Sequence, residues 1–328
     1  MVGKRELDDE RNLLYKEMKR IIEISKPLMF VAENVRGLLS MGKGEVIQQI
    51  VEEFTELGYD VKTKLLYAPE YGVPQERYRV FIVGSRKGFF HKDFEFPTKS
   101  TEVSRTVKES IGDLLELGVL ANHEITQTWP SYYNVIIDKI GLGQKLCNSR
   151  HSDSSVYTWN IPEIYGETNR QEKFLLETLA KNRRRKEFGP KDGNPLPAPI
   201  LATLTGFSLE LTNSLIHSLK EKEYLVERAN HTYDITKASF ARFKRIEWDK
   251  PSPTILTNFD NPRNFLHPSL PRPLTVREAA RLQTFPDDFI FTGKYTKQYR
   301  QVGNAVPPLL AFHVASAVWD HLSKDLKI

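Results

Sequence analysis

The N-terminal part of the chain carries two kinds of apolar pattern, one with helical and one with strand-like spacing. Apolar positions recur every three or four residues over 10–25 and 46–57, which predicts two amphipathic helices. Short apolar runs predict strands at 28–32, 61–67 and 78–84, the first and last of them buried. Helix, strand, helix, strand, strand is an α/β pattern, but three strands are too few to cover these helices. The sheet is therefore expected to begin elsewhere, on the N-terminal side.

From about residue 97 to residue 265 the periodicity is lost, except in one compact unit at 168–237. A capping box at Thr168–Gln171 predicts the start of a helix, and Ser208 is placed to cap a later helix with an inner face of leucines. Two short apolar runs at the end of the unit predict a β-ribbon. Helix, helix, turn, helix and ribbon is typical of a winged helix; the alternative is a small helical insert with a structural role.

The remaining residues return to capped helices. A second capping box at Thr275–Glu278 opens one helix, and Pro307–Pro308 opens a final one. The chain is therefore expected to divide into an α/β unit at 1–97, an insert at 98–265, and a segment at 266–328 that returns to the α/β unit.

Composition narrows the class of protein only a little. The 328 residues are 40% hydrophobic and 27% charged, and no apolar run approaches the ~20 residues that a membrane span needs. No secretory signal is visible, and the single cysteine, Cys147, excludes an internal disulfide and fits a reducing cytoplasm. The eight histidines are scattered, so no metal site is expected.

The positions of the charged residues indicate more about the partner than the net charge does. A net charge of +5 favours a nucleic-acid partner only weakly, since a solvated surface has the same balance. A run of basic residues predicts a phosphate-binding patch: Arg183, Arg184, Arg185 and Lys186. The outer face of the last helix in the predicted winged helix offers candidates for reading double-stranded DNA: Asn213, His217 and Lys220.

Four short segments carry the candidate chemistry. They are Phe30–Val35, Gln75–Arg79, Arg272–Pro286 and Gln301–Pro308. The first places Glu33 at the end of a strand, where open α/β sheets bind ligands. The second places Arg77 and Arg79 two residues apart, and so on one face of a strand. Taken singly, each has an ordinary structural explanation, such as a surface carboxylate, a salt-bridged edge or a turn into a helix.

Together and in this order, the four segments closely resemble the C-terminal motifs of the DNA cytosine-5 methyltransferases. Gly3, Arg5 and the stretch from Asp9 to Leu14 also resemble the segment just downstream of that family's catalytic loop. The stretch between about 97 and 243 corresponds to the family's variable target-recognition region. The resemblance implies an α/β fold: the C-terminal part of a Rossmann-like methyltransferase sheet that depends on S-adenosylmethionine, with a target-recognition insert that contains the winged helix.

The family's reaction explains these residue types. Cytosine C5 is a poor nucleophile until a thiolate adds to C6, so the enzyme needs a group at N3 and a donor at O2, and the base must be flipped out of the duplex. By resemblance, Glu33 would hold N3 and the 4-amino group, and Asn34 would support the turn beside it. Arg79, with Arg77 as a second candidate, would reach O2 and the active-site loop. The final motif, which packs near the methionine end of S-adenosylmethionine, is matched by Asn304, Ala305 and Val306.

Two parts of the family pattern are missing. No Phe-x-Gly-x-Gly turn for the cofactor is present, and Gly141-Leu142-Gly143 lies in the wrong region. Cys147 has no flanking proline and falls outside the expected order, so we interpret it as an incidental thiol. The chain is therefore expected to be a truncated or split prokaryotic, cytoplasmic methyltransferase that is inactive alone and needs an N-terminal methyltransferase subunit. The alternative is a non-catalytic DNA-binding or regulatory module.

Overall fold

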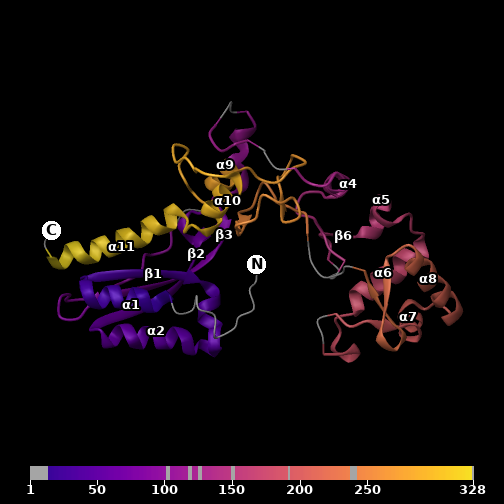
Figure 1. Cartoon of the computed structure of the whole chain (residues 1–328), viewed down its shortest axis with the longest axis horizontal. Helices are drawn as coiled ribbons and strands as arrows, with labels where there is room; N and C mark the ends of the chain where they lie inside the picture. The colour runs from indigo at the N-terminus through magenta and orange to yellow at the C-terminus, as the bar shows by residue number, and fades with distance from the viewer. Residues whose placement is uncertain are drawn as a thin grey trace.

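The computed structural model describes residues 14–100, 104–116, 120–124, 128–148, 152–190, 193–236 and 242–326. Figure 1 shows three regions along the molecule. A layered α/β unit contains both the N-terminal elements and the C-terminal helix. A loop-rich region surrounds α9 (Val276–Leu282) and α10 (Tyr295–Asn304), and a compact unit around α6 (Arg170–Asn182) and α8 (Leu209–Glu221) lies at the far end. The segment resembling the end of the catalytic loop, residues 3–12, lies outside the described residues.

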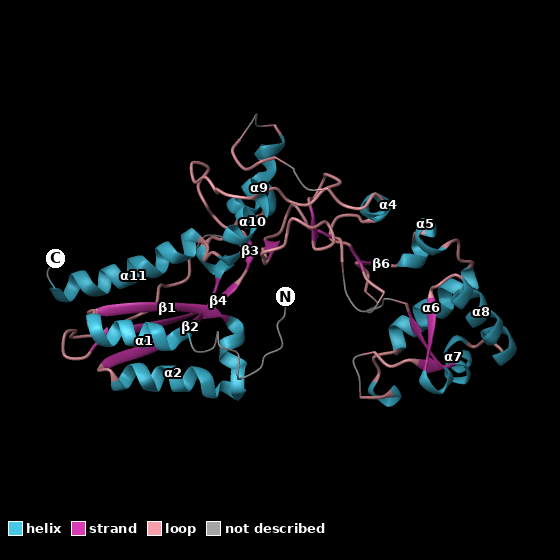
Figure 2. Cartoon of the chain, viewed as in Figure 1, coloured by secondary structure: helices cyan, strands magenta, loops and turns pink. Residues whose placement is uncertain are grey.

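The α/β unit is centred on a three-stranded antiparallel sheet with the order β1–β4–β2 (Figure 2). The strands are β1 (Met29–Val35), β2 (Tyr59–Tyr67) and β4 (Tyr78–Arg86). All three strands that the apolar runs predicted are present. The central strand, β4, is buried from Val80 to Ser85, which confirms the prediction of a strand covered on both faces.

The first strand differs from its prediction in length and in burial. It continues to Val35, so Glu33 and Asn34 lie inside the strand rather than at its end. Phe30 is its one buried residue, whereas Val31 and Val35 are 41% and 54% exposed. The prediction of a buried strand was wrong because β1 is an edge strand: among the strands that the structure describes, it pairs with β4 alone.

Helices cover both faces of the sheet. On one face, α1 (Leu14–Ser25) and α2 (Glu45–Glu56) pack through Ile22 and Phe54 into a core around Phe30. On the other face, α11 (Pro308–Leu326) packs through Leu310 and Val314 against Phe81. Figure 2 shows α11 running along the sheet opposite α1 and α2. A turn of 3-10 helix, η2 (Arg36–Gly44), joins β1 to α2.

The chain rejoins the α/β unit before the predicted boundary at residue 266, through a short parallel ladder between β11 (Ser252–Pro253) and β3 (Gln75–Glu76). Thr275 caps α9, and Glu278 bonds back to the Thr275 backbone, which confirms the predicted capping box. The helices α9 and α10 share a core with α3 (Val107–Ile111). Because this core contains residues from the start and the end of the predicted insert, together with α9 and α10, the chain leaves and re-enters the fold at one place.

Shorter elements connect these regions. They are η3 (Ala68–Tyr71), η4 (Gly112–Leu115), α4 (Tyr132–Lys139), β5 (Lys145–Leu146), β6 (Ser155–Val156), η5 (Thr158–Asn160), α5 (Pro162–Tyr165), η6 (Lys186–Phe188), η7 (Ala229–His231), β10 (Lys244–Arg245) and β12 (Phe265–Leu266). Within the described ranges no single helix is long and apolar enough to cross a membrane, although the bent pair α10–α11 meets the length and composition criteria together. The same residues contain no group of three or more His, Cys, Asp or Glu that could hold a metal ion.

The compact unit consists of three helices and a small antiparallel sheet. Between α6 and α8 lies α7 (Ala198–Thr205), and the sheet has the order β7 (Leu196–Pro197), β9 (Thr232–Ile235), β8 (Leu225–Arg228). Ser208 caps α8 as predicted. The first cap was predicted one residue too early: Asn169 and Glu172 form the capping box of α6, because the Thr168 hydroxyl instead donates to the Trp159 carbonyl.

Gly84→Ala should destabilise the sheet. A Cβ on Gly84 would lie 2.1 Å from Cε1 of Phe30, which sits directly opposite it and is held by Phe54 and Tyr59. We expect the free energy of unfolding in urea to fall by about 1–3 kcal/mol. Gly112→Ala is the control, since the nearest atom to its Cβ would be Cγ of Lys108 at 3.5 Å. Equal unfolding midpoints for the two variants would contradict this packing.

Candidate active site

A carboxylate and a guanidinium lie side by side on the face of the sheet that α11 covers. In the register of β1 and β4, Glu33 is opposite Phe81 and Val35 is opposite Arg79, so Glu33 and Arg79 are diagonal neighbours on one face. Arg79 Nε forms an ion pair with the Glu33 carboxylate. The two side chains are 12% and 29% exposed, respectively, so the pair is partly shielded while the carboxylate remains accessible.

Burial and the neighbouring charge shift the pKa of Arg79 in opposite directions. Burial lowers the pKa of Arg79, and the adjacent Glu33 carboxylate raises it. Asn34 points to the other face, as alternation along a strand requires, and its Oδ1 accepts a hydrogen bond of 2.8 Å from the Val35 amide. Asn34 therefore shapes the backbone at the end of β1 and leaves Glu33 as the group that faces the α11 side.

Arg77 does not share the position of Arg79. It precedes β4, is fully buried, and donates to the backbone carbonyls of Ile255 (3.0 Å), Gly303 (3.0 Å) and Ala305 (2.9 Å). Burial lowers the pKa of Arg77 to about 9, so the guanidinium is still charged at neutral pH. The Arg79 charge lowers and the Glu33 carboxylate raises the pKa of Arg77, so Arg77 lies near the pair, but its own donors are taken up by these backbone carbonyls.

Asn304, Ala305 and Val306 stand at the end of α10, next to Arg77. The Ala305 carbonyl accepts from Arg77, and Gly303 packs so closely that a Cβ would lie 2.5 Å from the Leu256 carbonyl carbon. Asn304 itself is exposed. The backbone of this turn is thus held by Arg77, which lies two residues before Arg79 in the sequence, and the Asn304 side chain is exposed.

Two residues near the site were not predicted. Gln75 is fully buried, and its Oε1 accepts from the Ile255 amide at 3.0 Å, beside the Arg77 contact. The guanidinium of Arg36 lies 5.0 Å from the centre of the exposed Tyr78 ring, which stacks on Tyr67 at 4.4 Å. Their positions in the sequence could have indicated that they lie near the site: Gln75 lies two residues before Arg77, and Arg36 follows β1 directly.

Fewer of the predicted basic residues can bind phosphate than the sequence suggested. Arg183 is buried and ion-paired with Asp234 at 2.9 Å, so the structure removes it from the phosphate-binding candidates. Its three successors, Arg184, Arg185 and Lys186, are exposed, although Arg185 also pairs with Glu187 at 2.9 Å. Because an arginine paired with a carboxylate attracts phosphate less strongly, exposure alone does not make a binding patch.

The candidate reading face of α8 is exposed as its leucine pattern predicted. Leu215 and Leu219 are buried, whereas the outer positions carry the polar candidates Asn213, His217 and Lys220. Two of them have acidic neighbours: His217 lies 3.3 Å from Glu221, and Lys220 pairs with Glu227, which raises the pKa of Lys220. The face is polar and accessible, with part of its positive charge balanced.

Comparison with known proteins identifies the family. The sequence model described as "C-5 cytosine-specific DNA methylase" matches residues 1–319. The chain belongs to the C-5 cytosine-specific DNA methylases. It is 29% identical to the type II methyltransferase M.BanI of Aneurinibacillus aneurinilyticus, over 91% of this chain and 72% of M.BanI. It is 30% identical to the type II methyltransferase M.AgeI of Thalassovita gelatinovora, over 96% of this chain and 79% of M.AgeI.

A solved structure supports the fold of this DNA methylase. The crystal structure of a protein described as a DNA modification methyltransferase, encoded within an E. coli prophage, superposes with a TM-score of 0.51. The superposition covers 96% of this chain and 76% of that one at 22% identity. At this identity the likeness concerns the fold.

The single cysteine of this DNA methylase lies away from Glu33. Cys147 is buried, and its amide donates to the carbonyl of Val156 in β6. In Figure 1, β6 lies well away from β1, on the path to the compact unit. The thiol is therefore buried in a different part of the molecule from Glu33.

Arg77→Lys should destabilise this DNA methylase although it preserves the charge. A single ammonium cannot reach carbonyls that two separate guanidinium nitrogens now bind, so buried carbonyls of Ile255, Gly303 or Ala305 would lose their donor. We expect a loss of about 2–4 kcal/mol in the free energy of unfolding, measured in urea. Arg228→Lys, at an exposed position, is the matched control and should change little. An unaltered unfolding curve for Arg77→Lys would refute the role assigned to these bonds.

Proposed function

We propose that this chain is the base-holding and DNA-reading part of a DNA cytosine-5 methyltransferase. The observation that carries the proposal is the Glu33–Arg79 ion pair, formed across β1 and β4 in a member of the cytosine-5 methylase family. The match to type II methyltransferases supports a role in restriction–modification, with bacterial, cytoplasmic DNA as the substrate.

The pair has the donors and acceptors that a flipped cytosine requires. One Glu33 oxygen can accept from the 4-amino group, while the other must carry a proton and donate it to N3, where negative charge develops as C6 is attacked. Arg79 holds the carboxylate in orientation and is the candidate donor to O2. The donors of Arg77 are bound to the carbonyls of Ile255, Gly303 and Ala305. We therefore assign Arg77 the role of positioning Arg79, and not that of contacting the base.

The reaction needs two groups that the described residues do not place near Glu33. Attack at C6 requires a thiolate, and the one cysteine of the sequence, Cys147, is buried elsewhere. Enzymes of this family take the methyl group from S-adenosylmethionine. The candidates to touch it are Asn304, Ala305 and Val306, which can supply one wall of a site but no glycine-rich turn. We therefore propose that methyl transfer depends on a further segment that carries the thiolate and the cofactor turn.

DNA reading is proposed for the compact unit as a winged helix. Three helices followed by the β8–β9 ribbon match that order of elements, with α8 as the recognition helix. Asn213, His217 and Lys220 would face base edges, while Arg184, Arg185 and Lys186 would contact phosphates, which fix position without reading sequence. Arg183 keeps the patch in place through its ion pair with Asp234.

The purified chain alone should transfer no methyl group from labelled S-adenosylmethionine to unmethylated genomic DNA, because no thiolate reaches the base. M.BanI under the same conditions is the positive control. Turnover by this chain would contradict the proposed dependence on a further segment, and its loss in Cys147→Ala would show that Cys147 is the nucleophile. The alternative of a non-catalytic DNA-binding module predicts that no added segment restores activity.

Reversing the charge of Arg184 and Arg185 should weaken binding to duplex DNA. If each contacts one phosphate, the slope of log affinity against log salt concentration should decrease by about 2, measured by fluorescence anisotropy. Lys87→Glu with Lys324→Glu is the control, since it makes the same change in net charge at exposed positions of the α/β unit. Equal losses in the two double variants would mean that net charge, and not the patch, binds DNA.

A further inference from the structure

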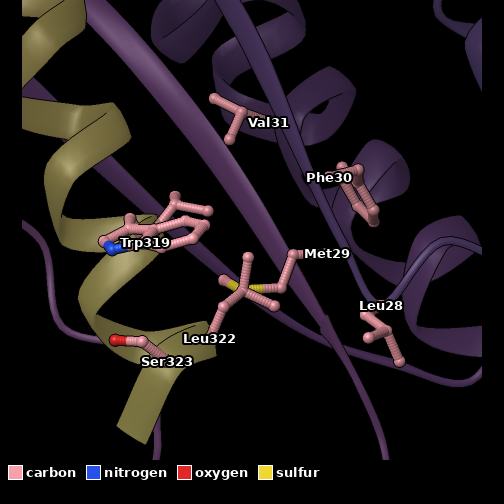
Figure 3. A pocket seen from close by; sticks show the side chains of 8 residues that line it. Leu28, Met29, Phe30, Val31, Trp319, Leu322 and Ser323 are labelled. Carbon is pink, nitrogen blue, oxygen red and sulfur yellow. The ribbon is translucent and has the colours of Figure 1, made fainter. Parts of the chain in front are cut away.

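Buried ionisable side chains gather where the predicted insert joins the C-terminal segment. His267 and Glu278 are 0% and 1% exposed, and Arg245 is 8% exposed. The groove between β1 and α11 is different: its lining is apolar apart from Ser323, and Figure 3 shows no ionisable group among the residues that it labels. Because a buried ionisable group is costly unless its partners are in place, the cluster at the insert depends on how the chain is arranged around it.

Residues 267–272 form a loop that connects two of the hydrophobic cores, and we call it the joint loop. Leu266, just before the loop, belongs to the core around α4. Leu274, just after it, belongs to the core around α9 and α10. The first core lies within the predicted insert, and the second is built around the C-terminal helices. The shape of the joint loop therefore sets how the insert meets the C-terminal segment.

Two buried side chains hold the joint loop in its shape. Nδ1 of His267 accepts from the backbone amides of Ser269 and Leu270, each at 3.1 Å. Arg245 donates to the carbonyls of His267 (2.7 Å) and Leu270 (3.0 Å). The His267 amide also donates to the Arg272 carbonyl at 2.8 Å, which closes the loop. Of the two side chains, the imidazole is the one whose ordinary charge change falls near neutral pH.

These hydrogen bonds also place the proton of the neutral imidazole. Because Nδ1 of His267 accepts from two amides, it carries no proton, and the ring proton lies on Nε2. Nε2 is buried without a hydrogen-bond partner among the described residues and lies 3.6 Å from Oε1 of Glu278. A second proton could bind only at Nδ1, where it would point at the N–H groups of Ser269 and Leu270. Protonation of the ring and the two amide bonds therefore exclude each other.

The surroundings of the imidazole oppose its protonation on balance. Burial lowers the pKa of His267 to about 4; the Glu278 carboxylate raises it, and Arg272, Arg245 and His123 lower it further. Burial raises the pKa of Glu278, but Arg272, which donates to both carboxylate oxygens, brings it below its ordinary value. Glu278 therefore stays ionised at pH 5, and it still faces the ring when His267 takes up a proton.

We propose that His267 is an acid-sensitive latch: the neutral ring holds the joint loop closed, and protonation at Nδ1 releases the amides of Ser269 and Leu270. The opened loop lets the insert shift against the C-terminal segment. Because the pKa of His267 in the closed loop lies below its ordinary value of 6.5, the latch contributes its full stability above pH 6.5 and loses it as the pH falls toward 4. The latch involves neither Glu33 nor DNA, so its test is independent of the proposed function.

The test measures amide hydrogen exchange of the full chain, residue by residue, at pH 7.5 and pH 5.0, corrected for intrinsic rates. We expect the protection of the Ser269 and Leu270 amides to fall on the order of 30-fold, because the opened loop binds a proton with the ordinary pKa of 6.5. The β4 amides should keep their protection. Equal protection of the joint loop at both pH values, or an equal loss in β4, would overturn the latch.

Two substitutions of His267 separate the acceptor from the charge. His267→Asn places an amide oxygen near the position of Nδ1 and does not titrate, so the loop should be protected as in the parent at pH 7.5 and equally at pH 5.0. His267→Phe removes the acceptor, so protection should fall about tenfold or more already at pH 7.5. His123→Asn is the matched control, because this second imidazole bonds to the Thr275 hydroxyl and should leave the pH dependence of the parent unchanged.

A pH-dependent loss that persists in His267→Asn, or that disappears in His123→Asn, would assign the effect to another group and overturn the proposal. The nitrogen chemical shifts of the His267 ring give an independent measurement: at pH 7.5, Nδ1 should be unprotonated and Nε2 protonated. The opposite tautomer would overturn the latch as well, since Nδ1 could then accept from neither amide. If His267→Phe does not fold, His267→Asn and the ring shifts still decide between these outcomes.

Discussion

The fold depends on one buried cation. The Arg77 guanidinium binds the carbonyls of Ile255, Gly303 and Ala305, which are 178, 226 and 228 positions away in the sequence. A buried charge is costly unless its donors are satisfied, so Arg77 is stable only when the C-terminal segment is in place. That segment likewise needs Arg77, because its carbonyls would otherwise be buried without donors. The two ends of the α/β unit must therefore form together, whatever the insert between them does.

This constraint also couples the active site to the fold. Arg79 follows Arg77 by two residues, and the Asn304 turn is fixed through the Ala305 carbonyl. The backbone beside the Glu33–Arg79 pair is thus held by the bonds that Arg77 makes to backbone carbonyls. The orientation of the candidate site is therefore fixed, but it depends on residues more than two hundred positions away in the sequence.

The sequence predicted what depends on local periodicity. The helices, the three strands, the Ser208 cap and the Thr275–Glu278 box follow from spacing and from side chains within four residues. Burial of β1 was mispredicted because it depends on which strands pair with it. Arg183 was predicted to bind phosphate because its partner, Asp234, is 51 residues away in the sequence, and no local pattern indicates the ion pair. The role of Arg77 was invisible for the same reason.

The number of arginines in this chain is therefore a weak indicator of nucleic-acid binding. Arg245 and Arg277, like Arg77, are buried and donate to backbone carbonyls of other segments: Arg245 to Ile137, Ile140 and His267, and Arg277 to Ala121, Pro286 and Phe289. Such residues add to a net charge of +5 without adding to the potential that DNA meets at the surface. A guanidinium suits this work because its planar fork can bind several carbonyls at once. The exposed cations are a smaller set, and on the compact unit several of them have acidic partners: Arg185 pairs with Glu187, and Lys220 with Glu227. If the compact unit reads DNA as proposed, recognition there rests on the arrangement of polar groups more than on the amount of positive charge.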